Sequence, residues 1–162
     1  MEPMHSEPQY SVRQAGKADV SAVTTLVNSA FEIERFFKDG DRTDARGVAA
    51  MLRLGKILLL TCEERIVACV FVKQAGDRLY AGMLAADPDW PVPRAGLRLM
   101  DETEVYARAA GCKWLDIRIV SVRPELNRLY RRRGFVETGT EPGDSINSAT
   151  VPVHFITMTK PL

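Results

Sequence analysis

A tyrosine in the last third of the chain lies in a pattern that suits proton chemistry. Tyr130 shares one face of a predicted helix with Leu126, Leu129 and Arg133, because these residues follow one another at steps of three and four. Gly134 directly follows Arg133, and glycine suits the left-handed conformation in which a helix often ends. A phenol with a pKa of about 10 can donate a proton to a stronger base formed beside it. The alternative is a half-buried aromatic ring that packs beside Leu126.

A second candidate site is the start of the preceding helix. The first N–H groups of a helix have no intrahelical partner and lie at its positive dipole end, so they bind pyrophosphate well. Here these groups belong to Arg94, Ala95, Gly96, Leu97 and Arg98. Pro91 and Pro93 in the preceding connection have no N–H to offer. Three interpretations stay open: the arginines bind phosphate, the Arg94 side chain obstructs the slot, or the segment is merely a stiff connection.

The elements that position these residues follow from hydrophobic periodicity. Strands are predicted over residues 10–14, 56–62, 66–73, 78–85, 114–120, 136 onward and 153–159, and helices over 19–32, 43–54, 95–110 and 124–133. We expect Asp19 to cap the first helix and Gly55 to end the second in a left-handed conformation. Residues 66–72 are apolar on both faces, which predicts an inner strand. Residues 36–41 and 141–150 are predicted loops.

This order of elements predicts an α/β (α+β) domain. Its central sheet is expected to be mixed and largely antiparallel, with about six to seven strands and helices on both faces. The length of 162 residues predicts one domain over residues 10–162, after a flexible tail at residues 1–9.

Two motifs in this order resemble the GNAT superfamily of N-acetyltransferases. Residues 129–135 match the family's L-Y-x-x-x-G-F ending completely, in Leu129, Tyr130, Gly134 and Phe135. Residues 84–100 match its cofactor loop, Q/R-x-x-G-x-G/A, in part. Aligned on Pro88, Pro91 replaces the Gln or Arg, Arg94 replaces the first glycine, and Gly96 matches the second. The resemblance runs from about residue 10 to residue 162.

The resemblance implies a GNAT-like acyl-CoA N-acyltransferase fold and an activity. Acetyl-CoA would be the co-substrate, with no metal, and an amine would attack the thioester directly. Tyr130 would protonate the leaving thiolate. The resemblance also implies that the backbone of Met83, Leu84 and Ala85 pairs with the pantetheine and that residues 94–98 hold the pyrophosphate. It places Asn127 near the CoA-facing surface. It implies that Glu32 and Glu34 line the wall of the acceptor site.

Two parts of this interpretation stay open in the sequence. No carboxylate lies on the strand before the cofactor loop, so Asp87, Asp89, Glu32 and Glu34 are the candidate general bases. The altered cofactor loop also leaves an alternative function: a catalytically degenerate GNAT-fold domain that binds acyl-CoA as a sensor or interaction module.

Composition excludes several other classes of protein. The net charge of +1 argues against an extended nucleic-acid interface, despite the run Arg131-Arg132-Arg133. The longest apolar run, residues 57–60, is too short to cross a membrane. The three cysteines form no CxxC pair and the sequence has only two histidines, which argues against a zinc site. An odd number of cysteines, together with an N-terminus that shows no secretory pattern, predicts a cytoplasmic location. We expect a monomer or a homodimer.

Overall fold

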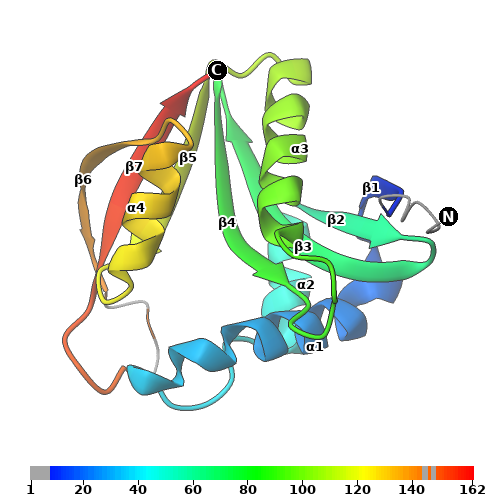
Figure 1. Ribbon diagram of the computed structural model, residues 1–162, viewed down its shortest axis with the longest axis horizontal. Coiled ribbons are helices and arrows are strands. Elements are labelled where there is room, and N and C mark those ends of the chain that lie inside the picture. Colours follow the sequence, from blue (N-terminus) through cyan, green and yellow to red (C-terminus); the bar gives the residue numbers. More distant parts are fainter. Residues whose placement is uncertain (1–7, 144–145, 147–148) are drawn as a thin grey trace, which may run out of the picture.

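A seven-stranded mixed sheet forms the centre of the protein in a computed structural model that describes residues 8–143, 146 and 149–162 (Figure 1). Its strands are β1 (Tyr10–Gln14), β2 (Lys56–Cys62), β3 (Arg65–Ala75), β4 (Arg78–Ala86), β5 (Trp114–Val120), β6 (Val136–Pro142) and β7 (His154–Pro161). They are arranged in the order β1-β2-β3-β4-β5-β7-β6, and β4 and β5 form the parallel pair. The predicted mixed, largely antiparallel sheet is confirmed.

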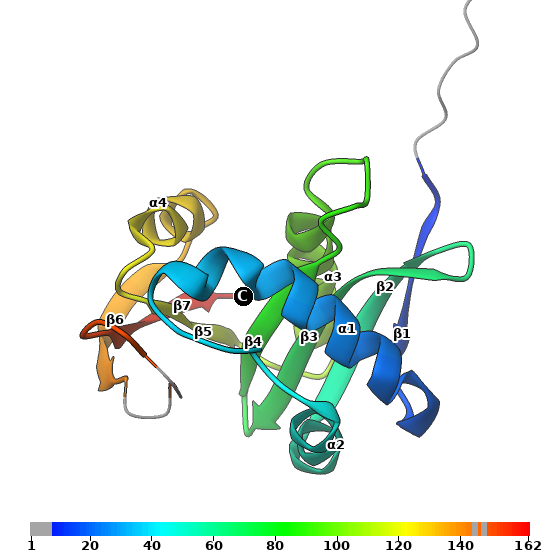
Figure 2. The ribbon, with the colours of Figure 1, turned by 90° about the horizontal axis from the view of Figure 1, so that it is seen from below.

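Helices cover both faces of this sheet, as predicted (Figures 1 and 2). The helices are α1 (Val20–Ala30), α2 (Ala45–Leu54), α3 (Ala95–Ala109) and α4 (Pro124–Arg132). Residues alternate along β2, so that Leu58 and Leu60 pack with α3 on one face. Ile57 and Leu59 pack with α1 and α2 on the other face. The continuous apolar run of β2 therefore reflects burial on both sides.

The first helix differs from its prediction at both ends. It ends at Ala30, and the chain continues as the 3-10 helix η2 (Phe31–Phe36), where a helix end and a loop were expected. Asp19 precedes the helix but its side chain does not cap it. The Asp19 carboxylate instead accepts hydrogen bonds from Arg13 at 2.8 and 2.9 Å and from the Gly16 N–H at 2.8 Å. A guanidinium within reach is a stronger partner than a helix amide.

The second helix begins two residues later than predicted, because Asp44 caps it by accepting from the Gly47 N–H at 2.8 Å. The prediction that Gly55 is left-handed is wrong, since its φ is −163°. A Cβ at Gly55 would lie 2.4 Å from the carbonyl oxygen of Val72. Glycine is therefore required here by the close approach of β3 and not by backbone conformation.

The parallel strands β4 and β5 pair at only one end, and this split positions the site. The two strands pair over three positions, which end at Tyr80 on β4 and Asp116 on β5. Further along β4, a register shift against β3 leaves one extra residue, and Met83 takes a φ of +52°. A bulge bends its strand and disrupts the local ladder. The backbone of β4 is consequently open on the β5 side beyond Tyr80.

Parts of the sequence predictions lie outside the described residues. These are residues 1–7 of the expected tail, and residues 144–145 and 147–148 of the expected loop 141–150. Within the described part of the chain, no helix has the length and apolar character needed to cross a membrane. The described residues also contain no group of three or more side chains suited to hold a metal ion.

Candidate functional site

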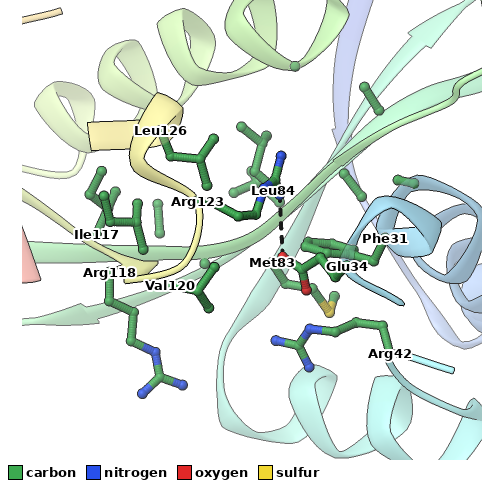
Figure 3. A pocket seen from close by; sticks show the side chains of 18 of the residues that line it. Phe31, Glu34, Arg42, Met83, Leu84, Ile117, Arg118, Val120, Arg123 and Leu126 are labelled. Carbon is green, nitrogen blue, oxygen red and sulfur yellow. Dashed lines mark hydrogen bonds and ion pairs between the residues drawn. The ribbon is translucent and has the colours of Figure 1, made fainter. Parts of the chain in front are cut away.

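A cavity of about 640 Å³ lies where β4 and β5 separate. Its walls come from both strands, from the start of α3, from one face of α4, and from η2, which reaches across the open end (Figures 1 and 3). Leu84 on β4 and Ile117 on β5 form apolar walls, and Leu126 on α4 completes them. Segments that lie far apart in the sequence therefore form one site.

The first turn of α3 presents free amide groups to this cavity. Ala95, Gly96 and Leu97 line it. The first intrahelical bond runs from the Arg98 N–H to the Arg94 carbonyl at 2.9 Å, so the preceding three amides have no helical acceptor. This arrangement can bind an anion such as a pyrophosphate.

Arg98 lies outside the cavity lining, unlike the other residues of the predicted binding segment. Its N–H is already used within the helix. Its side chain lies outside the cavity lining, 5.6 Å over the ring of Tyr10, and forms an ion pair with Glu102 at 3.7 Å. The Arg98 N–H is therefore not one of the free amides at this helix start.

Arg94 lines the cavity in a conformation that usually requires glycine. Its φ is +69° and its ψ is 25°, in the left-handed region. Glycine adopts this conformation freely, whereas an arginine does so at a steric cost of about 1–3 kcal/mol. Pro91 and Pro93 are exposed and lie outside the cavity lining, so their missing N–H groups take nothing from it.

Tyr130 reaches the cavity from α4, together with Leu126 and Leu129 on the same helix face. Its side chain is 8% exposed, and its ring meets Phe135 edge to face at 5.4 Å. Burial raises the pKa of Tyr130, so its phenol is protonated at neutral pH. Among the described residues, none hydrogen-bonds its hydroxyl. Gly134 follows with a φ of +96°, as predicted.

The β4 backbone at Met83, Leu84 and Ala85 also lines the cavity. Met83 and Leu84 fall within the register shift against β3, and β5 has already diverged. Backbone groups on an open strand edge bind extended ligands by strand-like hydrogen bonds, independent of side-chain type. The sequence prediction for these three residues agrees with their position.

Glu34 is a buried carboxylate at the η2 end of the cavity (Figure 3). It is 5% exposed and pairs with Arg123 at 3.3 Å, a contact that joins η2 to the loop before α4. Burial raises the pKa of Glu34 above its ordinary value, although the Arg123 charge acts in the opposite direction. Glu32, its predicted companion, is exposed, bonds Arg35 at 2.7 Å, and lies outside the lining.

The other sequence candidates lie away from the cavity. Asn127 bonds the carboxylate of Glu137 and lies outside the lining. Asp87 pairs with Arg65 at 2.7 Å, which lowers the pKa of its carboxyl, and Asp89 lies beside it outside the cavity. Of the four carboxylates considered as general bases, the structure brings only Glu34 into the site.

Four cations that sequence reasoning missed also line the cavity. They are Lys38, Arg42, Arg118 and Arg123. Arg123 carried the clearest signal, because it directly precedes the proline that opens α4 at a strand-to-helix loop. Lys38 and Arg42 lie in a turn-rich segment after η2. Arg118 lies on β5, on a strand face whose charged residues predict exposure to solvent.

Replacing Glu34 by glutamine is expected to remove one source of pH dependence in stability. Burial raises the folded pKa above the ordinary 4.5, so the folded chain holds this proton more tightly than the unfolded chain. The free energy of unfolding of the wild type should therefore fall relative to that of Glu34→Gln as pH rises from 4.5 to the folded pKa of Glu34. Above the folded pKa, the difference between the two proteins should stay constant. Urea unfolding of both proteins across that range measures this. A difference that does not change with pH would contradict the assignment.

Comparisons with known proteins agree with this geometry. The family profile described as acetyltransferase (GNAT) domain matches residues 8–119, more than half of the chain. No curated protein sequence matches the chain at a significant level.

Solved structures share the fold at low sequence identity. The ribosomal-protein-S18-alanine N-acetyltransferase from Escherichia coli is 16% identical, with a TM-score of 0.78 and 94% of each chain covered. Ribosomal-protein-alanine N-acetyltransferase from Brucella melitensis is 18% identical, with a TM-score of 0.74 over 94% of this chain and 99% of that one. The structure of yncA from Salmonella typhimurium with its cofactor acetyl-CoA is 19% identical, with a TM-score of 0.69 over 95% of this chain and 94% of that one.

The profile match and the split-strand cavity together place this chain in the GNAT family of acetyltransferases, enzymes that transfer acetyl groups.

Proposed function

We propose that this protein transfers the acetyl group of acetyl-CoA directly to the amine of a small molecule or peptide. One observation carries the proposal. The protonated Tyr130 phenol and the free amides of α3 line the same cavity, beside the open edge of β4. Acetyl transfer from a thioester that carries phosphates needs a proton donor for the leaving thiolate. It also needs an anion-binding group, such as this helix start, for the phosphates.

The residues present fit acetyl-CoA as a co-substrate. The amides of Ala95, Gly96 and Leu97 suit its pyrophosphate, and the Arg94 guanidinium adds a charge-assisted partner. The backbone of residues 83–85 suits the amides of its pantetheine arm. The cofactor supplies a thioester, whose carbonyl carbon is the electrophile.

Residues of the chain account for both proton movements. The amine nitrogen forms a bond to the carbonyl carbon, and the carbon–sulfur bond breaks. Tyr130 donates its proton to the departing thiolate, and Glu34 accepts the proton that the amine nitrogen loses. Two features support Glu34: it lies within the cavity, and burial raises the pKa of its carboxyl toward that of a useful base. No covalent intermediate with the protein is needed.

A cytoplasmic location is part of the proposal. The free thiols Cys62, Cys69 and Cys112 support it, because unpaired cysteines persist in reducing compartments.

Calorimetric titration with acetyl-CoA tests the proposed co-substrate. We expect binding in the micromolar range, and the same affinity for an analogue that keeps the pyrophosphate and pantetheine but lacks the sulfur. Loss of the pyrophosphate part should abolish binding, because the α3 amides then have no partner. No detectable binding of acetyl-CoA would mean that Arg94 closes the slot and would overturn the proposal. Tight binding without transfer to any amine would instead favour the sensor function.

A further inference from the structure

The η2 end of the cavity carries more cations than carboxylates. Cationic side chains from three elements line this end, whereas the acids in the lining are Glu34 and Asp41. The end lies on the face of the sheet that α1 and α2 cover, because η2 continues α1 directly. The anion site at the start of α3 lies on the opposite face, so these cations are separate from the proposed pyrophosphate site.

Two of the cations are already neutralised by carboxylates. Arg123 pairs with Glu34 at 3.3 Å. Arg118 pairs with Glu141 at 3.4 Å and lies over the ring of Phe155. Neither has a spare charge to offer to a ligand.

Lys38 is different, because it is buried and forms no direct ion pair with a carboxylate among the described residues. Its side chain is 6% exposed, and its ammonium donates to the backbone carbonyl of Asp41 at 3.1 Å. The Asp41 carboxylate turns instead to Arg35 at 3.5 Å. Burial of an ammonium against neutral groups is costly unless an anion completes the site.

At this end of the cavity, Arg42 is the second cation that has no carboxylate partner among the described residues. Its guanidinium lies 5.5 Å from the centre of the Phe31 ring, on the same side of the cavity as Glu34 (Figure 3). Its charge also acts on the Glu34 carboxyl, as does that of Lys38. Lys38 and Arg42 thus lie around the carboxylate that we propose as the base.

We infer that the acceptor is a small amine that carries a carboxylate, of the amino-acid type. Its carboxylate binds Lys38 and Arg42, and its amino group lies at Glu34. The inference rests on the proposed acetyl transfer and adds the substrate class to it. A ligand of this kind supplies the direct ion-pair partner that Lys38 lacks and matches the mixture of charges at this end of the cavity.

Matched pairs of acceptors test this inference. The free acid and the carboxamide of alanine, methionine and phenylalanine are compared by thiol release from acetyl-CoA. Within each pair, the acid carries a carboxylate charge that the carboxamide lacks. The amino group of the carboxamide is also less basic than that of the acid. We expect the acids to exceed the amides in kcat/KM by about tenfold or more, the effect of one lost charge-assisted hydrogen bond.

Two variants then connect the preference to the residues. Lys38→Met and Arg42→Gln should each lower kcat/KM for the acids about tenfold more than they lower kcat/KM for the amides, mainly through KM. Arg42 is exposed, so its variant keeps the test valid even if Lys38→Met folds poorly. Arg46→Gln, an exposed cation of α2 outside the lining, is the control and should change neither.

Equal use of acids and amides by the wild type, or an acid preference that both variants retain, would overturn the inference. Transfer to a simple monoamine such as tyramine, but to neither member of any pair, would also overturn it and leave the proposed function intact. No transfer to any amine while acetyl-CoA binds would overturn both.

Discussion

Tyr130→Phe should lower kcat by about 100-fold or more, the usual contribution of a positioned general acid. The ring stays in place against Phe135, so only the hydroxyl is lost. Affinity for acetyl-CoA should remain unchanged, since the groups proposed to hold the cofactor lie on α3 and β4. Stopped assays of thiol release at saturating amine and acetyl-CoA measure the effect.

The pH profile gives this prediction a second readout. Because burial raises the pKa of Tyr130 above its ordinary value, the wild type should keep its proton donor to higher pH than an exposed phenol would. Tyr106→Phe removes a half-buried hydroxyl of α3 outside the cavity and serves as the control, with activity unchanged. Unaltered turnover in Tyr130→Phe would assign the ring a packing role only.

Gly96→Leu is expected to weaken acetyl-CoA binding by roughly 100-fold, the equivalent of two lost hydrogen bonds to a charged group at about 1.5 kcal/mol each. A Cβ at Gly96 would point toward Leu84 and Ala86, 3.7 Å away, so a longer side chain extends between the first turn of α3 and β4. That is the entrance to the free amides. Calorimetric titration measures the affinity.

Gly96→Ala is the matched variant for this change. Its methyl group would make ordinary van der Waals contacts and leave the amides accessible, so binding should weaken only severalfold at most. Both variants should unfold at similar urea concentrations, because Gly96 has no left-handed φ that a side chain would strain. Equal affinity in wild type and Gly96→Leu would show that the cofactor does not use this helix start.

The parts of the site that sequence predicted are those built from short, local patterns. Tyr130 and Gly134 belong to one helix and its end, and their spacing alone fixes that the tyrosine faces inward. The free amides at the start of α3 likewise follow from where the helix begins. Arg98 differs from the three residues before it because its N–H already closes the first turn of the helix.

The parts that sequence missed depend on distant segments meeting. Glu34 and Arg123 lie 89 residues apart and join only because η2 crosses the open end between β4 and β5. Glu32 and Glu34 look alike in sequence, yet the 3-10 turn exposes the first and buries the second. Lys38 reads as a turn residue, and only tertiary packing buries its ammonium. Periodicity carries no information on such contacts.

The most direct test of acetyl transfer at this cavity is mass spectrometry of the products formed from acetyl-CoA and an amine panel. We expect an N-acetylated amine and free CoA in equal amounts with the wild type, and both to fall together in Tyr130→Phe. Bound acetyl-CoA with no acetylated amine from any member of the panel would contradict the account.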